Sequence, residues 1–98
     1  MDQIFISFMD KTETVTEYWS NGKIMFEHSY LNGKYHGMQK SWYENGNRNY
    51  ECSQINEDMH GLHQKWFEDG RRMFVRVWKN DSEYGPKIDF RLVDEYGQ

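Results

Sequence analysis

The chain has few cysteine and proline residues and no long apolar run. Its 98 residues include one cysteine and one proline. A lone cysteine, Cys52, excludes an intramolecular disulfide and is typical of a reducing compartment, so we expect a cytoplasmic protein. The apolar run at residues 4–9, IFISFM, is too short for a signal peptide or a membrane span, so no membrane association is expected.

The chain also lacks an excess of positive charge. The formal net charge is −4, and no block of basic residues offsets it. This balance argues against unaided binding to nucleic acid or to anionic lipid, both of which need a basic surface. No stretch shows sustained helical periodicity, so helices are not expected.

Aromatic residues and a regular repeat are what the sequence has instead. Aromatics make up 17% of the chain although hydrophobic residues make up only 37%, which indicates a folded domain rather than a disordered one. Two glycine series share one period of 24 residues: Gly22, Gly46 and Gly70, and Gly37, Gly61 and Gly85. Such a period indicates repeated structural units.

Each period contains two β-prone segments joined by turn residues. Asn-Gly or Asp-Gly between such segments predicts a type I′ hairpin turn, in which both central residues have positive φ. We therefore expect turns at Asn21–Gly22, Asn45–Gly46 and Asp69–Gly70, and further structural turns at Gly37, Gly61 and Gly85.

The predicted fold is all-β, a meander of about eight antiparallel strands in a single-layer twisted sheet. One domain spans residues 1–98. It comprises a degenerate half-unit (3–17), three repeats (about 18–41, 42–65 and 66–89) and a terminal strand (86–93). No residues remain to form a layer that would cover either face.

Alternation of side chains sorts this sheet into two faces. One face carries a row of aromatic residues, here termed the Trp42 row: Tyr18, Trp42, Trp66 and Phe90. Glu27, Glu51 and Lys40 lie beside it as a polar rim. Aromatic residues are frequent anchors of protein interfaces, so these seven residues are the predicted partner-binding site.

The residues suited to chemistry form no convincing active site. His28 and Cys52 occupy equivalent repeat positions, but as a nucleophile and base they would lie mid-sheet without a pocket. His60 and His63 are three residues apart, which places them on opposite faces of a strand rather than on one metal. His36 and His60 are expected to bond to the turn backbone. We expect no catalysis, no metal and no cofactor.

The pattern WYENG…YxxG…HG at a period of 24 residues resembles the variant MORN (membrane occupation and recognition nexus) repeat over about residues 18–90. The chain departs from it where Glu57 and Asp81 replace Gly33, and where Tyr84 replaces the histidine of His36 and His60. In bacteria the variant occurs in small proteins, some of them antitoxin components of toxin–antitoxin pairs. The resemblance implies a hairpin scaffold and a protein partner.

These observations favour a non-enzymatic module that binds and occludes one partner protein, as an antitoxin does to its toxin. Two alternatives stay open. One is an inhibitor, encoded by a virus or mobile element, of a host defence or effector protein. The other is a structural scaffold that assembles as a homo-oligomer.

Overall fold

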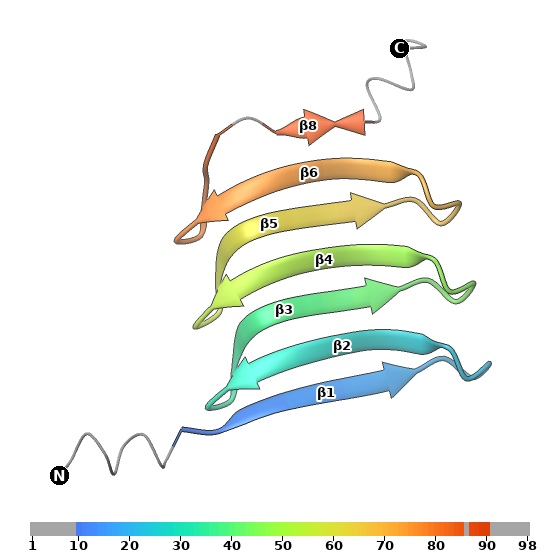
Figure 1. The fold of residues 1–98 in the computed structure, drawn as a ribbon, viewed down its shortest axis with the longest axis horizontal. Helices are drawn as coiled ribbons and strands as arrows, with labels where there is room; N and C mark the ends of the chain where they lie inside the picture. The colour runs from blue at the N-terminus through green and yellow to red at the C-terminus, as the bar shows by residue number, and fades with distance from the viewer. Residues whose placement is uncertain (1–9, 86, 91–98) are drawn as a thin grey trace, which may run out of the picture.

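The computed structural model describes residues 10–85 and 87–90. In this part of the chain there are eight strands: β1 (Thr12–Tyr18), β2 (Ile24–Leu31), β3 (Lys34–Trp42), β4 (Arg48–Ile55), β5 (Asp58–Trp66), β6 (Arg72–Lys79), β7 (Ser82–Glu83) and β8 (Ile88–Asp89). Figure 1 shows them stacked in chain order as one sheet. Strand follows strand without a crossover.

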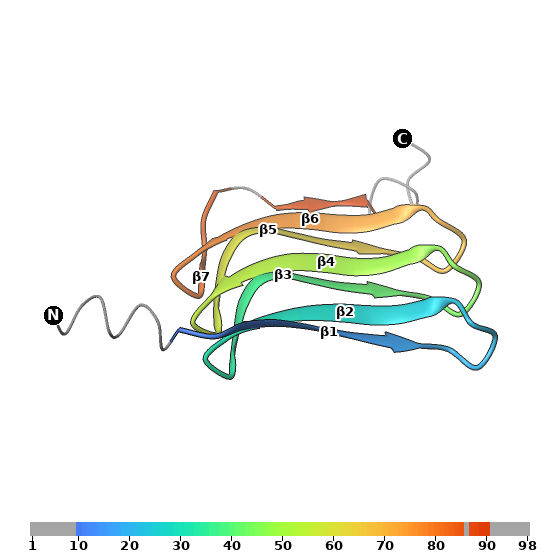
Figure 2. The same cartoon turned by 60° about the horizontal axis from the view of Figure 1, so that its bottom comes forward.

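The connectivity confirms the predicted meander. Each strand from β1 to β6 pairs antiparallel with the next, β8 pairs with β6, and the sheet does not close into a barrel. Its Cα atoms span only 12 Å along the shortest axis, and Figure 2 shows a single curved layer. Of the predicted half-unit and terminal strand, residues 3–9, 86 and 91–93 lie outside the described residues.

The Asn-Gly turns differ from the prediction. At Asn45–Gly46, the Gly46 N–H donates to the Tyr43 carbonyl (2.9 Å), and the Tyr43 N–H donates to the Asn47 carbonyl (2.8 Å). Gly46 has φ 95°, whereas Asn45 is not among the positive-φ residues. This is a type I turn followed by a glycine bulge, so the prediction of type I′ was wrong. Asn45 Oδ1 accepts the Asn47 N–H (2.8 Å), and this side-chain contact supports the type I turn.

Type I′ turns occur at the opposite ends of the strands. Both central residues have positive φ at Asn32–Gly33 (52° and 82°), Asn56–Glu57 (48° and 76°) and Asn80–Asp81 (51° and 66°). The predictions of turns at Gly37 and Gly61 were therefore wrong, whereas Gly85 lies in a bend. Gly37 and Gly61 lie inside β3 and β5 near register shifts, where the strands bend, and Gly85 lies between β7 and β8. Figure 1 shows the bends near the starts of β3 and β5.

The cross-strand register separates two faces. Phe26 pairs with Ser41, Ser41 with Tyr50, Tyr50 with Lys65, and Lys65 with Phe74. We name this side the Tyr50 face; it also carries the row His28, Gln39, Cys52, His63 and Arg76. The other side, the Trp42 face, carries the Trp42 row and the cross-strand row Glu27, Lys40, Glu51 and Gln64.

Burial is concentrated on the Tyr50 face. Of the five buried residues in the described chain, four lie there: Gln39, Ser41, Cys52 and Phe74. Rings pack beside them: Phe26 stacks on His28 (4.4 Å), and Phe74 meets His63 edge-on (5.2 Å). The bent sheet thus forms a thin core on one side without a second layer.

The Gln39 side chain supplies hydrogen bonds where the pairing of β2 with β3 is interrupted. The pairing of β2 with β3 shifts between His28 and Tyr30, so Ser29 has no partner residue in the register. The buried Gln39 amide substitutes for one: its Oε1 accepts the Ser29 N–H (3.0 Å) and its Nε2 donates to the Ser29 carbonyl (2.9 Å). A buried bulge is thereby kept fully hydrogen-bonded.

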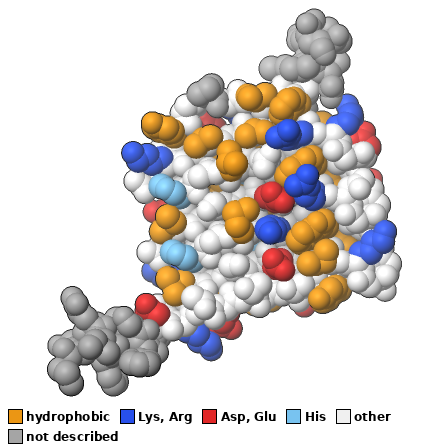
Figure 3. Space-filling model, viewed as in Figure 1, with side chains coloured by type: hydrophobic (Ala, Val, Ile, Leu, Met, Phe, Trp, Pro, Cys, Tyr) orange, Lys and Arg blue, Asp and Glu red, His pale blue; other side chains and the backbone are white. Residues whose placement is uncertain are grey.

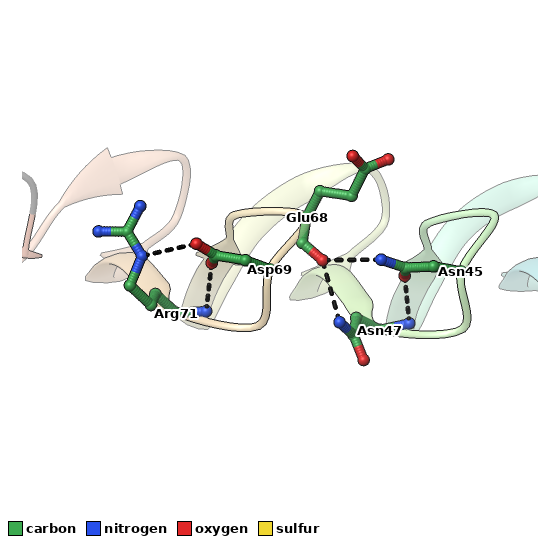
Figure 4. Close-up of polar contacts among 5 residues, drawn as sticks. All are labelled: Asn45, Asn47, Glu68, Asp69 and Arg71. Atoms are coloured by element: carbon green, nitrogen blue, oxygen red, sulfur yellow. Dashed lines mark hydrogen bonds and ion pairs between the residues drawn. The ribbon is translucent and has the colours of Figure 1, made fainter.

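Side chains of one turn reach the backbone of the next. Asn21 Nδ2 donates to the Glu44 carbonyl, and Asn45 Nδ2 donates to the Glu68 carbonyl, both at 2.9 Å. At the third turn Asp69 has no amide to donate and pairs instead with Arg71 (2.8 Å), as Figure 4 shows. At the other ends, His36 and His60 Nδ1 accept the N–H of Asn56 (3.3 Å) and Asn80 (3.5 Å), which confirms the turn-backbone role expected for them.

Two substitutions with opposite effects test the backbone geometry. Glu57→Gly should stabilise the protein by about 0.5–1 kcal/mol, because Glu57 has the φ of 76° that Gly33 adopts without strain. Gly61→Ala should destabilise it by about 1–3 kcal/mol, because φ is 97° there. Urea unfolding followed by tryptophan fluorescence measures both, and changes of the same sign would contradict the assigned turns.

Candidate protein-binding face

The Trp42 face combines a charged row with apolar side chains on both sides. Lys40 pairs in register with Glu27 on β2 and Glu51 on β4, so a basic residue separates the two acidic ones. Two further cross-strand pairs lie on this face, Met38 with Ser53 and Leu62 with Val77. Figure 3 shows one face of the molecule, where hydrophobic side chains alternate with acidic and basic ones and no deep hollow opens.

Several apolar side chains of this face are open to solvent. Tyr18 is 62% exposed, Leu62 is 53% exposed and Met38 is 41% exposed. Trp42 is half-buried, and the side chain of Phe90, which follows β8, is also of intermediate exposure. The exposed apolar side chains therefore lie on both sides of the charged row, Tyr18 on one side and Met38 and Leu62 on the other.

Trp66 differs from the other members of the Trp42 row. It is only 6% exposed, and the Arg48 guanidinium lies over its ring at 4.5 Å. Arg48 is itself held by Glu51 at 3.5 Å. Cation–π contacts at such sites contribute about 0.5–1 kcal/mol. Trp66 therefore supports the face from beneath, and a partner could touch its ring only after Arg48 moves.

The backbone carbonyls of two members of the Trp42 row accept side-chain hydrogen bonds from the preceding unit. Trp19 Nε1 donates to the Trp42 carbonyl (3.2 Å), and the Tyr43 hydroxyl donates to the Trp66 carbonyl (2.6 Å). Trp19 and Tyr43 come from the turns before these strands. The next equivalent residue, Phe67, has no donor. These contacts fix the ends of β3 and β5, where Trp42 and Trp66 lie.

The histidines and the cysteine do not assemble into a reactive group. Gln39 lies between His28 and Cys52 in the cross-strand register. His28 Nε2 is within hydrogen-bonding distance of the Tyr50 hydroxyl, at 3.0 Å. Burial raises the pKa of the Cys52 thiol, which keeps it protonated and weakly nucleophilic.

Neither an enclosed cavity nor a metal-binding group is found in the described part of the chain. No three histidine, cysteine or carboxylate side chains converge there, and the sheet surface is not hollowed into a pocket. None of the described residues form a helix that could span a membrane. The described surface is therefore a broad face and not an enclosed active-site pocket.

Comparison with known proteins identifies similarity to one family. The sequence model of the MORN repeat variant matches residues 14–32 and 35–56. The first match covers most of β1 and all of β2, and the second covers most of β3 and all of β4. No curated protein and no solved structure matches the chain. Repeats of this kind are often protein- or membrane-binding modules and are generally non-enzymatic.

The structure extends the repeat beyond these matches. The β5–β6 hairpin has the register of the β3–β4 hairpin displaced by 24 residues: Lys65 pairs with Phe74 as Ser41 pairs with Tyr50. The bulge after Lys65 also repeats the one after Ser41. The chain is therefore similar to the MORN repeat variant in its first units and keeps that architecture in the third.

Two histidines on the Tyr50 face make stability depend on pH. Burial lowers the pKa of His28, and burial together with Arg76 and Lys65 lowers the pKa of His63, whose Nδ1 accepts the Trp78 indole N–H (3.3 Å). Below about pH 6.5 the unfolded chain takes up protons that the folded chain resists. Stability should therefore be complete above that pH and fall as the pH drops from 7.5 to 5.5.

Urea midpoints at the two pH values measure this loss. His63→Gln, which keeps an acceptor for Trp78 but cannot become protonated, should reduce the difference between them. A midpoint that is unchanged or higher at pH 5.5 would contradict the assignment of neutral, buried histidines.

Proposed function

We propose that the protein is a non-enzymatic module that binds one partner protein through the Trp42 face and occludes it. The observation that carries this proposal is the exposed apolar surface of Tyr18, Met38 and Leu62 on a sheet that has no second layer. Monomeric proteins seldom expose apolar patches of more than a few hundred Å², and larger ones usually mark interaction sites.

The size of the face suits a protein partner. Six strands spaced ~4.8 Å apart, each with about eight residues rising ~3.3 Å, give an area of roughly 700 Å². A standard interface buries ~800 Å² on each partner. Covering one such face would bury about as much surface as a stable heterodimer requires.

The charges beside the apolar rows favour a defined orientation of that partner. Glu27, Lys40 and Glu51 alternate in sign along one row of the face, and charges that complement a partner contribute more to specificity than to affinity. In this proposal Tyr18, Trp42 and Phe90 contact the partner, and Trp66 holds Arg48 in place at the rim.

The kind of partner we propose rests on the resemblance to the MORN repeat variant, which in bacteria occurs in some antitoxin proteins. A broad face that covers an active surface would neutralise a toxin in the cytoplasm, where the free thiol of Cys52 stays reduced. A host defence or effector protein would be occluded in the same way if the chain is encoded by a virus or mobile element.

The test is affinity capture from the native host with tagged protein, read by mass spectrometry. A Met38→Lys/Leu62→Lys variant should lose the partner without unfolding, because both side chains are exposed. Trp66 is unsuitable, because replacing a buried tryptophan costs about 3–5 kcal/mol of stability. Tyr35→Lys is the matched control, since Tyr35 is 36% exposed and pairs with Tyr30, which lies on the Tyr50 face.

One heterologous protein retained by wild type and control but lost from the double variant would support the proposal. The affinity of the purified pair should then fall at least tenfold in the double variant. If the captured protein arrests growth when expressed alone, it is a toxin; if it does not, a host target is indicated. Self-association alone would contradict occlusion and favour a structural homo-oligomer.

A further inference from the structure

The two edges of the sheet are unlike. At one edge β1 extends over seven residues and, among the described residues, pairs with β2 only. At the other edge the outer strands β7 and β8 have two residues each. An edge strand presents backbone N–H and C=O groups that another extended segment can pair. The β1 edge is therefore long enough to accept an additional strand.

The first turn also has backbone carbonyls whose equivalents in later turns accept side-chain hydrogen bonds. The carbonyls of Trp42 and Glu44 receive side-chain hydrogen bonds from Trp19 and Asn21 of the preceding turn. The equivalent carbonyls of the first unit belong to Tyr18 and Ser20. No side chain in the described part of the chain donates to either. An incoming segment could supply these donors.

The side chains of β1 define what charge that segment should carry. Glu13, Val15 and Glu17 alternate along the strand and share the Tyr50 face, and all three are exposed. The Lys11 ammonium lies 3.7 Å from Glu13, an exposed ion pair that contributes little. Two carboxylates four residues apart, with an apolar residue between them, complement a strand with basic residues at the same spacing.

A second copy of the chain is a poor occupant. The segment TETVTE is nearly symmetric about Val15, so antiparallel pairing of two β1 strands would place Glu13 opposite Glu17 twice. Like charges directly opposite one another are destabilising. The far edge of another copy is short and carries Glu83 and Asp89, and its last turn has Phe67 and Asp69, neither of which carries a donor.

We propose that the β1 edge is a second binding site, which pairs antiparallel with an extended basic strand of another protein. The occupant carries lysine or arginine at positions i and i+4, opposite Glu17 and Glu13, and an apolar residue opposite Val15. Backbone pairing supplies the attachment and the two glutamates supply the selectivity. This site does not use the Trp42 face, so it stands or falls independently of the proposed function.

The test uses the full chain and short labelled peptides. The peptide TKTVTKY copies β1 with lysine in place of both glutamates, and TETVTEY keeps the native residues. Fluorescence anisotropy should show TKTVTKY binding at least tenfold tighter than TETVTEY, because two attractive pairs replace two repulsive ones. In a Glu13→Lys/Glu17→Lys variant the preference should reverse, because the basic edge then attracts the acidic peptide.

Two controls separate strand pairing from simple charge attraction. The peptide TKTPTKY keeps both lysines, but its proline breaks the central backbone pairing, so it should bind as weakly as TETVTEY. Hydrogen exchange should show new protection of β1 amides when TKTVTKY is added, with β4 unchanged.

The proposal is overturned if TKTVTKY binds no better than TKTPTKY, or if the charge reversal leaves its affinity unchanged. It is also overturned if the β1 amides of the free full chain are as protected as those of β4, because the edge would then already be covered.

Discussion

A sheet of one layer has no second layer to bury its side chains, so each hairpin must find its contacts in the hairpins beside it. The structure meets this constraint by linking neighbouring units at both ends and in the middle. Asn21 and Asn45 donate to the next turn, His36 and His60 accept from the next turn at the opposite end, and Gln39 completes the ladder at a bulge. Stability is therefore divided into nearest-neighbour terms, as in other repeat proteins.

The same constraint produces the surface proposed to bind a partner. Curvature brings the rings of the Tyr50 face together, and most of the buried residues lie there. The Trp42 face is left with Met38, Leu62 and Tyr18 exposed beside alternating charges. The two ends of the sheet also differ. In the described part of the chain the inter-turn donors stop at Phe67 and Asp69, and no side chain donates to the Tyr18 and Ser20 carbonyls of the first turn. The proposed binding face and the proposed β1 site both follow from this arrangement of repeated units.

Much of this architecture could be predicted from the sequence, because the 24-residue period and the alternation within strands are local signals. The separation of the two faces followed directly, with Lys40 and Glu51 on the same face as Trp42. The turn types did not, because the Asn45 side chain favours a type I turn and only the dihedral angles reveal which residue is left-handed. Gly61 was misplaced because a glycine at a bulge within a strand resembles a turn glycine in sequence. The burial of Trp66 was missed because it depends on Arg48 of the adjacent strand, which no local pattern encodes.

The central claim is that the Trp42 face is uncovered in the isolated protein. Solvent paramagnetic relaxation enhancement of methyl groups, measured on the dilute full chain, tests it most directly. The account predicts strong enhancement at Met38 and Leu62, with Val75 and Val77 of intermediate exposure showing less. Weak enhancement at Met38 and Leu62 would show that a second copy or another part of the chain already covers the face. That result would contradict the claim that the Trp42 face is exposed and free to bind a partner.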